Sequence, residues 1–275
     1  MRAKDKERVQ RLNPIDDDFL KKMAEDTDFC QEVISIATGN TSLKVISCTS
    51  QKWVKNLQGR SVVLDIVCED EQGTLILVEV QKADDDDHVR RVRYNTSCIT
   101  ANVTMPGERF KEIKDIISIY ITKNDFIGEQ FPKEPAKAVY HVDRMVRETG
   151  KILDNGITEI YINAKIKDNS DASKLMRVFL ENDAYDYEVC PVTSKRKYYL
   201  KNTDKGVEEM CVIMDEVRAE GIEKGRVEGI IHMAGTLLKH NLSEEYIISV
   251  LQEELNLTKE EAREFFAEKV AGLQK

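Results

Sequence analysis

Two acidic residues stand inside apolar segments whose composition is typical of β-strands. Asp65 lies in SVVLDIVC (residues 61–68), and Glu79 lies in TLILVEVQ (residues 74–81). The polar stretch between them ends in Gly73 and predicts the turn of a hairpin. Paired residues of an antiparallel hairpin have numbers that add up to a constant, so a turn centred on residue 72 puts Asp65 directly opposite Glu79. We therefore expect the two carboxylates side by side.

Such a pair of carboxylates is costly unless something compensates its charge. Burial disfavours an ionised acid, and like charges on facing strand positions repel each other. A divalent cation relieves both costs, and hard oxygen ligands suit Mg²⁺ or Mn²⁺. The alternative is that the polar residues only mark a side of the sheet that faces solvent. The spacing alone favours neither interpretation.

A predicted helix over residues 89–103 carries residue types that suit nucleic-acid contacts. Arg90, Arg93, Tyr94 and Ser97 share one helical face by their spacing. Arginine can hold phosphates there, and the tyrosine can contact a sugar or a base. The alternative is an ordinary solvated helix face.

A second basic segment interleaves charges with aromatic rings. It reads KRKYYLK and includes Lys195, Arg196 and Lys197. This pattern suits contacts to a nucleic-acid backbone with stacking on the rings. It also fits an exposed edge strand that lysines protect from pairing.

The other elements expected along the chain alternate between helices and strands. Helical spacing predicts two short helices over residues 15–37 and another over 174–182. Further strands are expected over residues 43–50, 116–122 and 158–164. This order indicates an α/β fold in which strands enclose helices.

The pattern of apolar residues changes near residue 205. Apolar residues then follow a 3-4 spacing, and Gly221, Gly225 and Gly229 recur every four residues. Each glycine inside a helix costs about 1 kcal/mol relative to alanine, so either a partner backbone comes close or the helix is loose. Shorter helices follow, the last beginning at a Thr258 and Glu261 capping box. We expect a flexible arm at 1–13 and an α/β domain that contains the acid pair at 14–205. We expect residues 206–275 to form a helical segment through which copies of the chain associate.

Composition limits the function classes. Hydrophobic residues make up 41% of the chain, which is too many for a disordered protein, and no apolar run is long enough for a bilayer span. The amino terminus has no apolar signal-peptide core, so we expect a cytoplasmic protein. The net charge of -9 argues against indiscriminate coating of nucleic acid.

The spacing of the cysteines predicts neither a metal site nor a set of disulfides. The six are Cys30, Cys48, Cys68, Cys98, Cys190 and Cys211. They lie far apart in the chain without a CxxC pair, so we expect reduced and mostly buried thiols.

Several segments together resemble a known family. They are Asp16–Lys21, Gly59–Ile66, Gly73–Gln81, Arg90–Tyr94 and Met105–Phe110. This set resembles the PD-(D/E)XK nuclease superfamily, and in particular its transposase-associated branch, the recombination-promoting nuclease (Rpn) family. The resemblance covers roughly residues 14–200.

The resemblance implies a restriction-endonuclease-like mixed sheet flanked by helices, with a helical C-terminal segment. Asp65 and Glu79 would be the metal-binding carboxylates, and the backbone carbonyl of Val80 would be a further ligand. Gln81 occupies the position of the superfamily lysine. Asp17 matches an acidic position that could support the site, although a helix cap or a solvated acid is the simpler role for it.

The function this implies is a Mg²⁺- or Mn²⁺-dependent DNA endonuclease linked to recombination or mobile DNA. The metal would activate a water to attack a phosphodiester. The rival is a DNA-binding or assembly protein that keeps the fold without efficient cleavage. Gln81 and the acidic net charge favour the rival, whereas the retained acid pair favours the enzyme.

Overall fold

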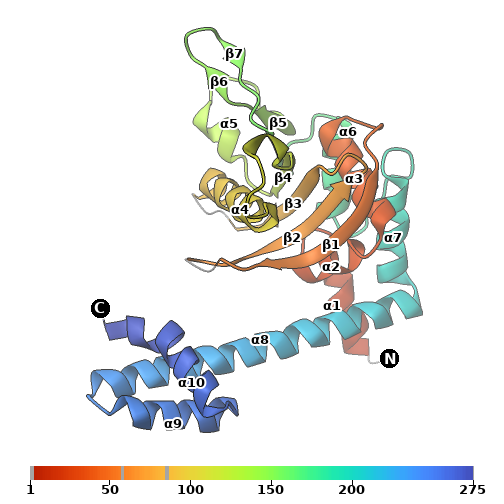
Figure 1. Ribbon diagram of the computed structural model, residues 1–275. Helices are drawn as coiled ribbons and strands as arrows, with labels where there is room; N and C mark the ends of the chain where they lie inside the picture. The colour runs from red at the N-terminus through yellow and green to blue at the C-terminus, as the bar shows by residue number, and fades with distance from the viewer. Residues whose placement is uncertain (1–2, 57–58, 84–86, 275) are drawn as a thin grey trace. The chain divides into compact units, whose positions relative to one another are not determined.

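The computed structural model describes residues 3–56, 59–83 and 87–274 (Figure 1). The chain divides into two compact units, Met1–Cys211 and Val212–Lys275. The border lies inside the helix α8 (Asp204–Lys239), beyond the domain border expected at residue 205. Val207 and Met210, in the first turns of this helix, are fully buried in the first unit.

A mixed six-stranded sheet forms the centre of the first unit, in the order β1-β2-β3-β4-β8-β5. Its strands are β1 (Val45–Val54), β2 (Val62–Asp70), β3 (Leu75–Gln81), β4 (Ile116–Thr122), β5 (Val139–Val142) and β8 (Ile157–Asn163). β3, β4 and β8 run parallel, while the other neighbours pair antiparallel. The predicted α/β fold with a mixed sheet is confirmed.

The predicted hairpin is β2 and β3. Its register pairs Ile66 with Val78 and Val67 with Leu77. Continued by one residue, this register sets Asp65 opposite Glu79, as the sequence predicts.

Helices cover both faces of the sheet. Val67 and Leu77 pack in one cluster with Ile99 of α4 (His88–Val103). Cys68, the next residue along β2, instead lies beside Cys30 of α3 (Thr27–Thr38). Successive strand residues point to opposite faces, so α4 and α3 pack on opposite sides of the sheet.

The remaining helices of the first unit are α1 (Ala3–Arg11), α2 (Asp17–Met23), η1 (Phe110–Glu112), α5 (Phe126–Gln130), α6 (Asp171–Leu180) and α7 (Pro191–Asn202). Two of them differ from expectation. The amino-terminal segment is not a loose arm, because it forms α1 and buries Val9. The basic-aromatic segment is not an edge strand, because it forms α7, which begins with Pro191 at its first turn.

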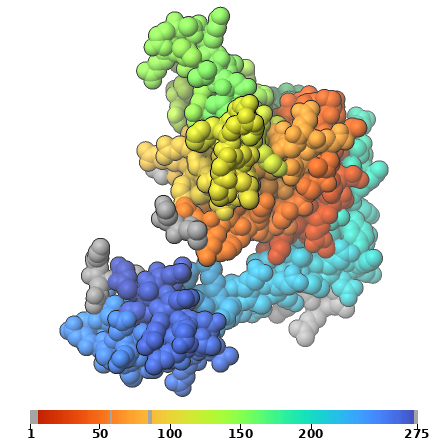
Figure 2. Space-filling view, viewed as in Figure 1, coloured from red at the N-terminus to blue at the C-terminus, as the bar shows by residue number. Residues whose placement is uncertain are grey.

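A two-stranded sheet of β6 (Met145–Val146) and β7 (Lys151–Ile152) projects from the first unit. It lies in the green part of the chain in Figure 2. No pattern in the sequence predicts this small sheet. Its strands are only two residues long, which is too short for a recognisable alternation.

The second unit contains the rest of α8 with α9 (Glu244–Leu255), α10 (Lys259–Phe265), η2 (Phe266–Val270) and η3 (Ala271–Gln274). Ala234, Ile247 and Val270 belong to its apolar core. The predicted capping box at Thr258 and Glu261 is present. Among the residues that the structure describes, no helix is long and apolar enough to cross a membrane.

Candidate active site

One polar cleft of about 360 Å³ collects the acid pair and three further residues singled out in the sequence, Asp17, Val80 and Gln81. It lies where β2 and β3 carry their two central acids. Its lining consists of Asp17, Val63, Asp65, Glu79, Val80, Gln81, Lys82, Ala83, Arg91 and Tyr120. Residues from α2, β2, β3, β4 and α4 thus meet at one place.

The two carboxylates are linked to each other's strands by hydrogen bonds. The backbone N–H of Asp65 donates to Oε1 of Glu79 over 3.2 Å. In return, the backbone N–H of Val80 donates to Oδ2 of Asp65 over 2.9 Å. The carboxylates therefore take over the bonding between the strands where the backbone register ends at Ile66 and Val78.

Val80 lies with its polar backbone towards this pair. The N–H and C=O of one strand residue point to the same neighbouring strand, and the N–H of Val80 points to Asp65. The carbonyl oxygen of Val80 is therefore on the side of β3 that faces Asp65. This placement agrees with the role that the resemblance implies for it.

Burial makes the charged forms of both acids costly. It raises the pKa of Asp65 to about 6, although the hydrogen bond from Val80 opposes the rise. Burial also raises the pKa of Glu79 well above its usual value, and the neighbouring charge of Asp65 adds to that rise. A cation between the two oxygen donors would remove both costs, so the residues present fit a hard divalent ion.

Gln51 is a site residue that the sequence analysis missed. Its side-chain amide donates to Oδ1 of Asp65 over 3.3 Å. The residue has a φ of 50°, a left-handed conformation that is rare for any residue other than glycine and is strained in the middle of a strand. No sequence pattern marks it, because the contact depends on how β1 lies beside β2.

Arg91 is the second residue that the sequence analysis missed. It lines the cleft from α4 and forms an ion pair with Asp87 at 3.3 Å. Its charge lowers the pKa of both Asp65 and Glu79, although burial outweighs this effect. The expected helical face was built on Arg90 and Arg93, and Arg91 falls outside that face.

Gln81 and Lys82 both line the cleft, at the end of β3. Gln81 follows Glu79 by two residues on β3 and lines the cleft with it. The ammonium of Lys82 forms an ion pair with Asp16, at the start of α2. This ion pair holds the Lys82 ammonium at the start of α2, although Lys82 also lines the cleft.

Asp17 is the first residue of α2 and lines the same cleft. The cap position belongs to Asp16 and Asp17 is exposed, so of the two simpler roles the solvated acid fits Asp17 and the helix cap does not. The charge of Asp17 contributes to the raised pKa of Asp65, which places the two acids within electrostatic reach.

The helix α4 presents its predicted residues in different ways. Arg90 and Arg93 are exposed. The Tyr94 hydroxyl donates to the carbonyl oxygen of Arg60 over 2.6 Å and accepts a hydrogen bond from Asn56. Tyr94 thus fastens α4 to the segment before β2, and its hydroxyl is used within the fold.

Two of the three basic residues of α7 predicted to contact DNA are instead bound to other parts of the fold. Lys197 is fully buried, and its ammonium donates to the carbonyl oxygens of Val178 and Ala184 at 2.8 and 3.1 Å. Burial lowers the pKa of Lys197 to about 8. Its charge satisfies carbonyl groups at the carboxyl end of α6 and is not available to DNA.

Arg196 has a similar structural role at another helix end. It donates to the carbonyl oxygens of Lys22 and Met23 at 2.6 and 3.0 Å, where α2 ends. It also forms an ion pair with Asp26. Of the three predicted residues, Lys195 remains exposed.

Comparison with protein families supplies the decisive observation. Residues 27–185 match the PD-(D/E)XK nuclease family transposase. The chain belongs to this family. No curated protein and no solved structure matches the chain.

The family match includes the hairpin with Asp65, Glu79 and Gln81, and it includes Arg91. PD-(D/E)XK nucleases typically use a divalent metal, which agrees with the carboxylate pair of the cleft. Asp17 precedes the matched residues and Lys195 follows them.

Proposed function

We propose that the chain is a Mg²⁺-dependent DNA endonuclease of the Rpn branch, linked to recombination or mobile DNA. The observation that carries this proposal is the pair of carboxylates, Asp65 and Glu79, held together by backbone hydrogen bonds in a polar cleft. Membership of the nuclease family supports the substrate class.

The acid pair and its neighbours on β3 have defined parts in this proposal. Asp65 and Glu79 hold Mg²⁺ or Mn²⁺, with the backbone carbonyl of Val80 as a third donor. An ion held there would lower the pKa of a water and stabilise the charge that grows on the phosphate. Gln81 orients the water or the phosphate through hydrogen bonds of its amide.

Arg91 supplies positive charge at the cleft in addition to Lys82, whose ammonium is paired with Asp16. The superfamily lysine places a charge beside the phosphate, whereas the amide of Gln81 is neutral. Arg91 lines the same cleft from α4, so its guanidinium can approach a phosphate bound at the carboxylates. Asp17 supports the site from α2.

The DNA backbone outside the cleft would contact exposed basic residues. Arg90 and Arg93 project from the helix that also carries Arg91, and Lys195 is exposed on α7. Contacts of this kind position the duplex without reading its sequence.

We also propose that the C-terminal helices join copies of the chain. Gly221, Gly225 and Gly229 are exposed on α8, and a Cβ atom added at any of them would meet open space. A strip without side chains lets a partner helix approach closely. Two copies would bring two metal sites to the two strands of one duplex.

Plasmid DNA incubated with the purified full-length protein tests the enzyme. We expect nicking or cutting with Mg²⁺ or Mn²⁺ and none with a chelator. Asp65→Asn and Glu79→Gln should each abolish cleavage, because each removes one ionic ligand while keeping the side-chain shape.

Glu69→Gln is the matched control. Glu69 lies on β2, as Asp65 does, but it forms an ion pair with Lys114 and does not line the cleft. The Glu69 variant should cleave like the unaltered protein. Equal cleavage by all variants would indicate a contaminating nuclease or a different site. Metal-dependent DNA binding without cleavage would favour the non-catalytic rival, in which Gln81 marks the loss of efficient chemistry.

A further inference from the structure

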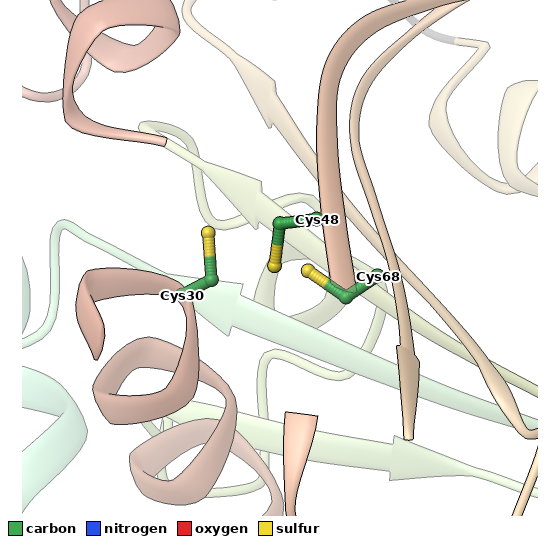
Figure 3. A group of neighbouring side chains, drawn as sticks. All are labelled: Cys30, Cys48 and Cys68. Carbon is green, nitrogen blue, oxygen red and sulfur yellow. The ribbon is translucent and has the colours of Figure 1, made fainter. Parts of the chain in front are cut away.

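Three cysteines that are far apart in the sequence lie together in the first unit. They are Cys30 on α3, Cys48 on β1 and Cys68 on β2, and their Sγ atoms all lie within 4.8 Å of one another (Figure 3). The sequence spacing suggested no such group, because none of the pairs has the short separation of a metal motif.

The fold explains how the group forms. Cys48 and Cys68 are direct partners in the antiparallel pairing of β1 and β2, so their side chains stand on the same face of the sheet. The helix α3 packs over that face and brings Cys30 to the pair. The Cys30 thiol also donates a weak hydrogen bond to the carbonyl oxygen of Ala24 at 3.6 Å.

We propose that Cys30, Cys48 and Cys68 bind one thiophilic divalent cation, Zn²⁺, at a site separate from the carboxylate cleft. Zinc–sulfur bonds of about 2.3 Å in a tetrahedral site place two sulfurs about 3.8 Å apart. The observed sulfur separations therefore need to shrink by at most about 1 Å, which side-chain rotation can provide. Cys30 and Cys68 are buried while Cys48 is partly exposed, so Cys48 gives the ion a path from solvent.

The ligand chemistry separates this site from the acid pair. Soft thiolates select zinc-like ions, whereas carboxylates and carbonyls select Mg²⁺ and Mn²⁺. Three thiolates around Zn²⁺ leave a smaller net charge than around a monovalent ion such as Cu⁺, and a smaller charge costs less in a mostly buried place. One chain can therefore hold both kinds of metal without exchange between the sites.

The arrangement fits a metal better than a disulfide. A disulfide joins two sulfurs and leaves the third cysteine without a role, whereas one ion uses all three. Binding needs no oxidant, because the thiols lose their protons to the buffer as the zinc–sulfur bonds form. A bound ion would tie α3 to β1 and to β2, the strand that carries Asp65.

Titration of the reduced full-length protein with Co²⁺ and Zn²⁺, in excess Mg²⁺, tests the site. We expect a thiolate-to-Co²⁺ charge-transfer absorption that Zn²⁺ abolishes, one Zn²⁺ retained per chain, and a melting temperature that rises when Zn²⁺ is added. Replacement of Cys30, Cys48 and Cys68 together by alanine should remove all three signals.

The other three cysteines provide a matched control. Cys98 and Cys190 are buried and Cys211 is partly exposed, the same set of environments as in the proposed site. Their joint replacement by alanine should leave the zinc signals intact. If the first triple variant does not fold, as circular dichroism would reveal, Cys48→Ala alone should still weaken Zn²⁺ binding at least 10-fold, because Cys48 is only partly buried.

Several results would overturn the proposal. They are Zn²⁺ retention by the folded Cys30, Cys48 and Cys68 variant, absence of the charge-transfer band in the unaltered protein, or binding of Cu⁺ alone. A disulfide within the group that forms under air and accounts for all loss of thiol would also overturn it. None of these results depends on nuclease activity, so the zinc site and the proposed function fail separately.

Discussion

The backbone N–H of Asp65 donates a hydrogen bond to the carboxylate of Glu79 over 3.2 Å. The two acids are therefore held by the hairpin itself and do not depend on a ligand to bring them together. The arrangement stores an electrostatic cost, because burial raises the pKa of both groups. A substitution that removes one of these charges should therefore stabilise the metal-free protein.

Asp65→Asn should stabilise the metal-free protein at neutral pH. The pKa of Asp65 is raised from 3.8 to about 6, so above pH 6 the folded protein carries the full cost of the charge. That cost declines between pH 6 and pH 4, because the folded state takes up the proton first. We expect a gain of about 1–3 kcal/mol at pH 7.5 and almost none at pH 4, from urea unfolding in a chelator.

The asparagine can keep the contacts of Asp65, since its oxygen can accept from Val80 and the amide of Gln51 can turn to accept from its nitrogen. Added Mg²⁺ should stabilise the unaltered protein and not the variant. A gain that is equal at pH 4 and pH 7.5 would contradict the electrostatic origin.

Gln81 variants test what the cleft requires at the position of the superfamily lysine. Gln81→Lys should preserve or raise the cleavage rate, because it adds a charge beside the phosphate. Gln81→Leu should lower the rate, because it removes both hydrogen-bonding groups. Rates on plasmid DNA at saturating Mg²⁺ measure the effect, and full activity of the leucine variant would exclude Gln81 from the mechanism.

Arg91→Gln should lower the cleavage rate about 10- to 100-fold, the range for loss of one charge-stabilising group. Its charge also lowers the pKa of Asp65 and Glu79, so its removal should move the acid limb of the pH–rate profile to higher pH. Arg144→Gln, at an exposed position that does not line the cleft, is the control. A profile unchanged in the Arg91 variant would place Arg91 outside the site.

Lys197→Ala should destabilise the first unit by about 2–4 kcal/mol, because it leaves buried carbonyl groups without a donor. Lys195→Ala should change the stability by less than about 0.5 kcal/mol, since Lys195 is exposed. Chemical unfolding separates the two, and DNA affinity should fall only for the Lys195 variant. A stable Lys197 variant with weakened DNA binding would reverse this assignment.

Replacing Gly221, Gly225 and Gly229 by alanine tests the association of the C-terminal helices. Each alanine fits within one chain and should favour the helix by about 0.5–1 kcal/mol. The added methyl groups should nevertheless hold a partner helix away, so the mass from light scattering should fall while helix content is kept. An unaltered chain that scatters as a monomer would contradict the association.

The hairpin and its facing acids could be predicted because they are local. Strand alternation has a fixed period of two, and a short turn sets the register, so Asp65 and Glu79 follow from residues 61–81 alone. The strand β4 and the capping box at Thr258 were predictable for the same reason, since each depends on neighbouring residues.

Contacts between distant segments were decided only by tertiary structure. Lys197 was expected on the surface because its neighbours are basic, yet α7 turns it towards the end of α6. Arg91 and Gln51 reach the cleft through the packing of α4 and the irregular backbone of β1. The three cysteines meet because α3 covers one particular face of the sheet. A linear pattern reports which face of its own element a residue occupies, but the burial of apolar surface between elements decides what that face meets.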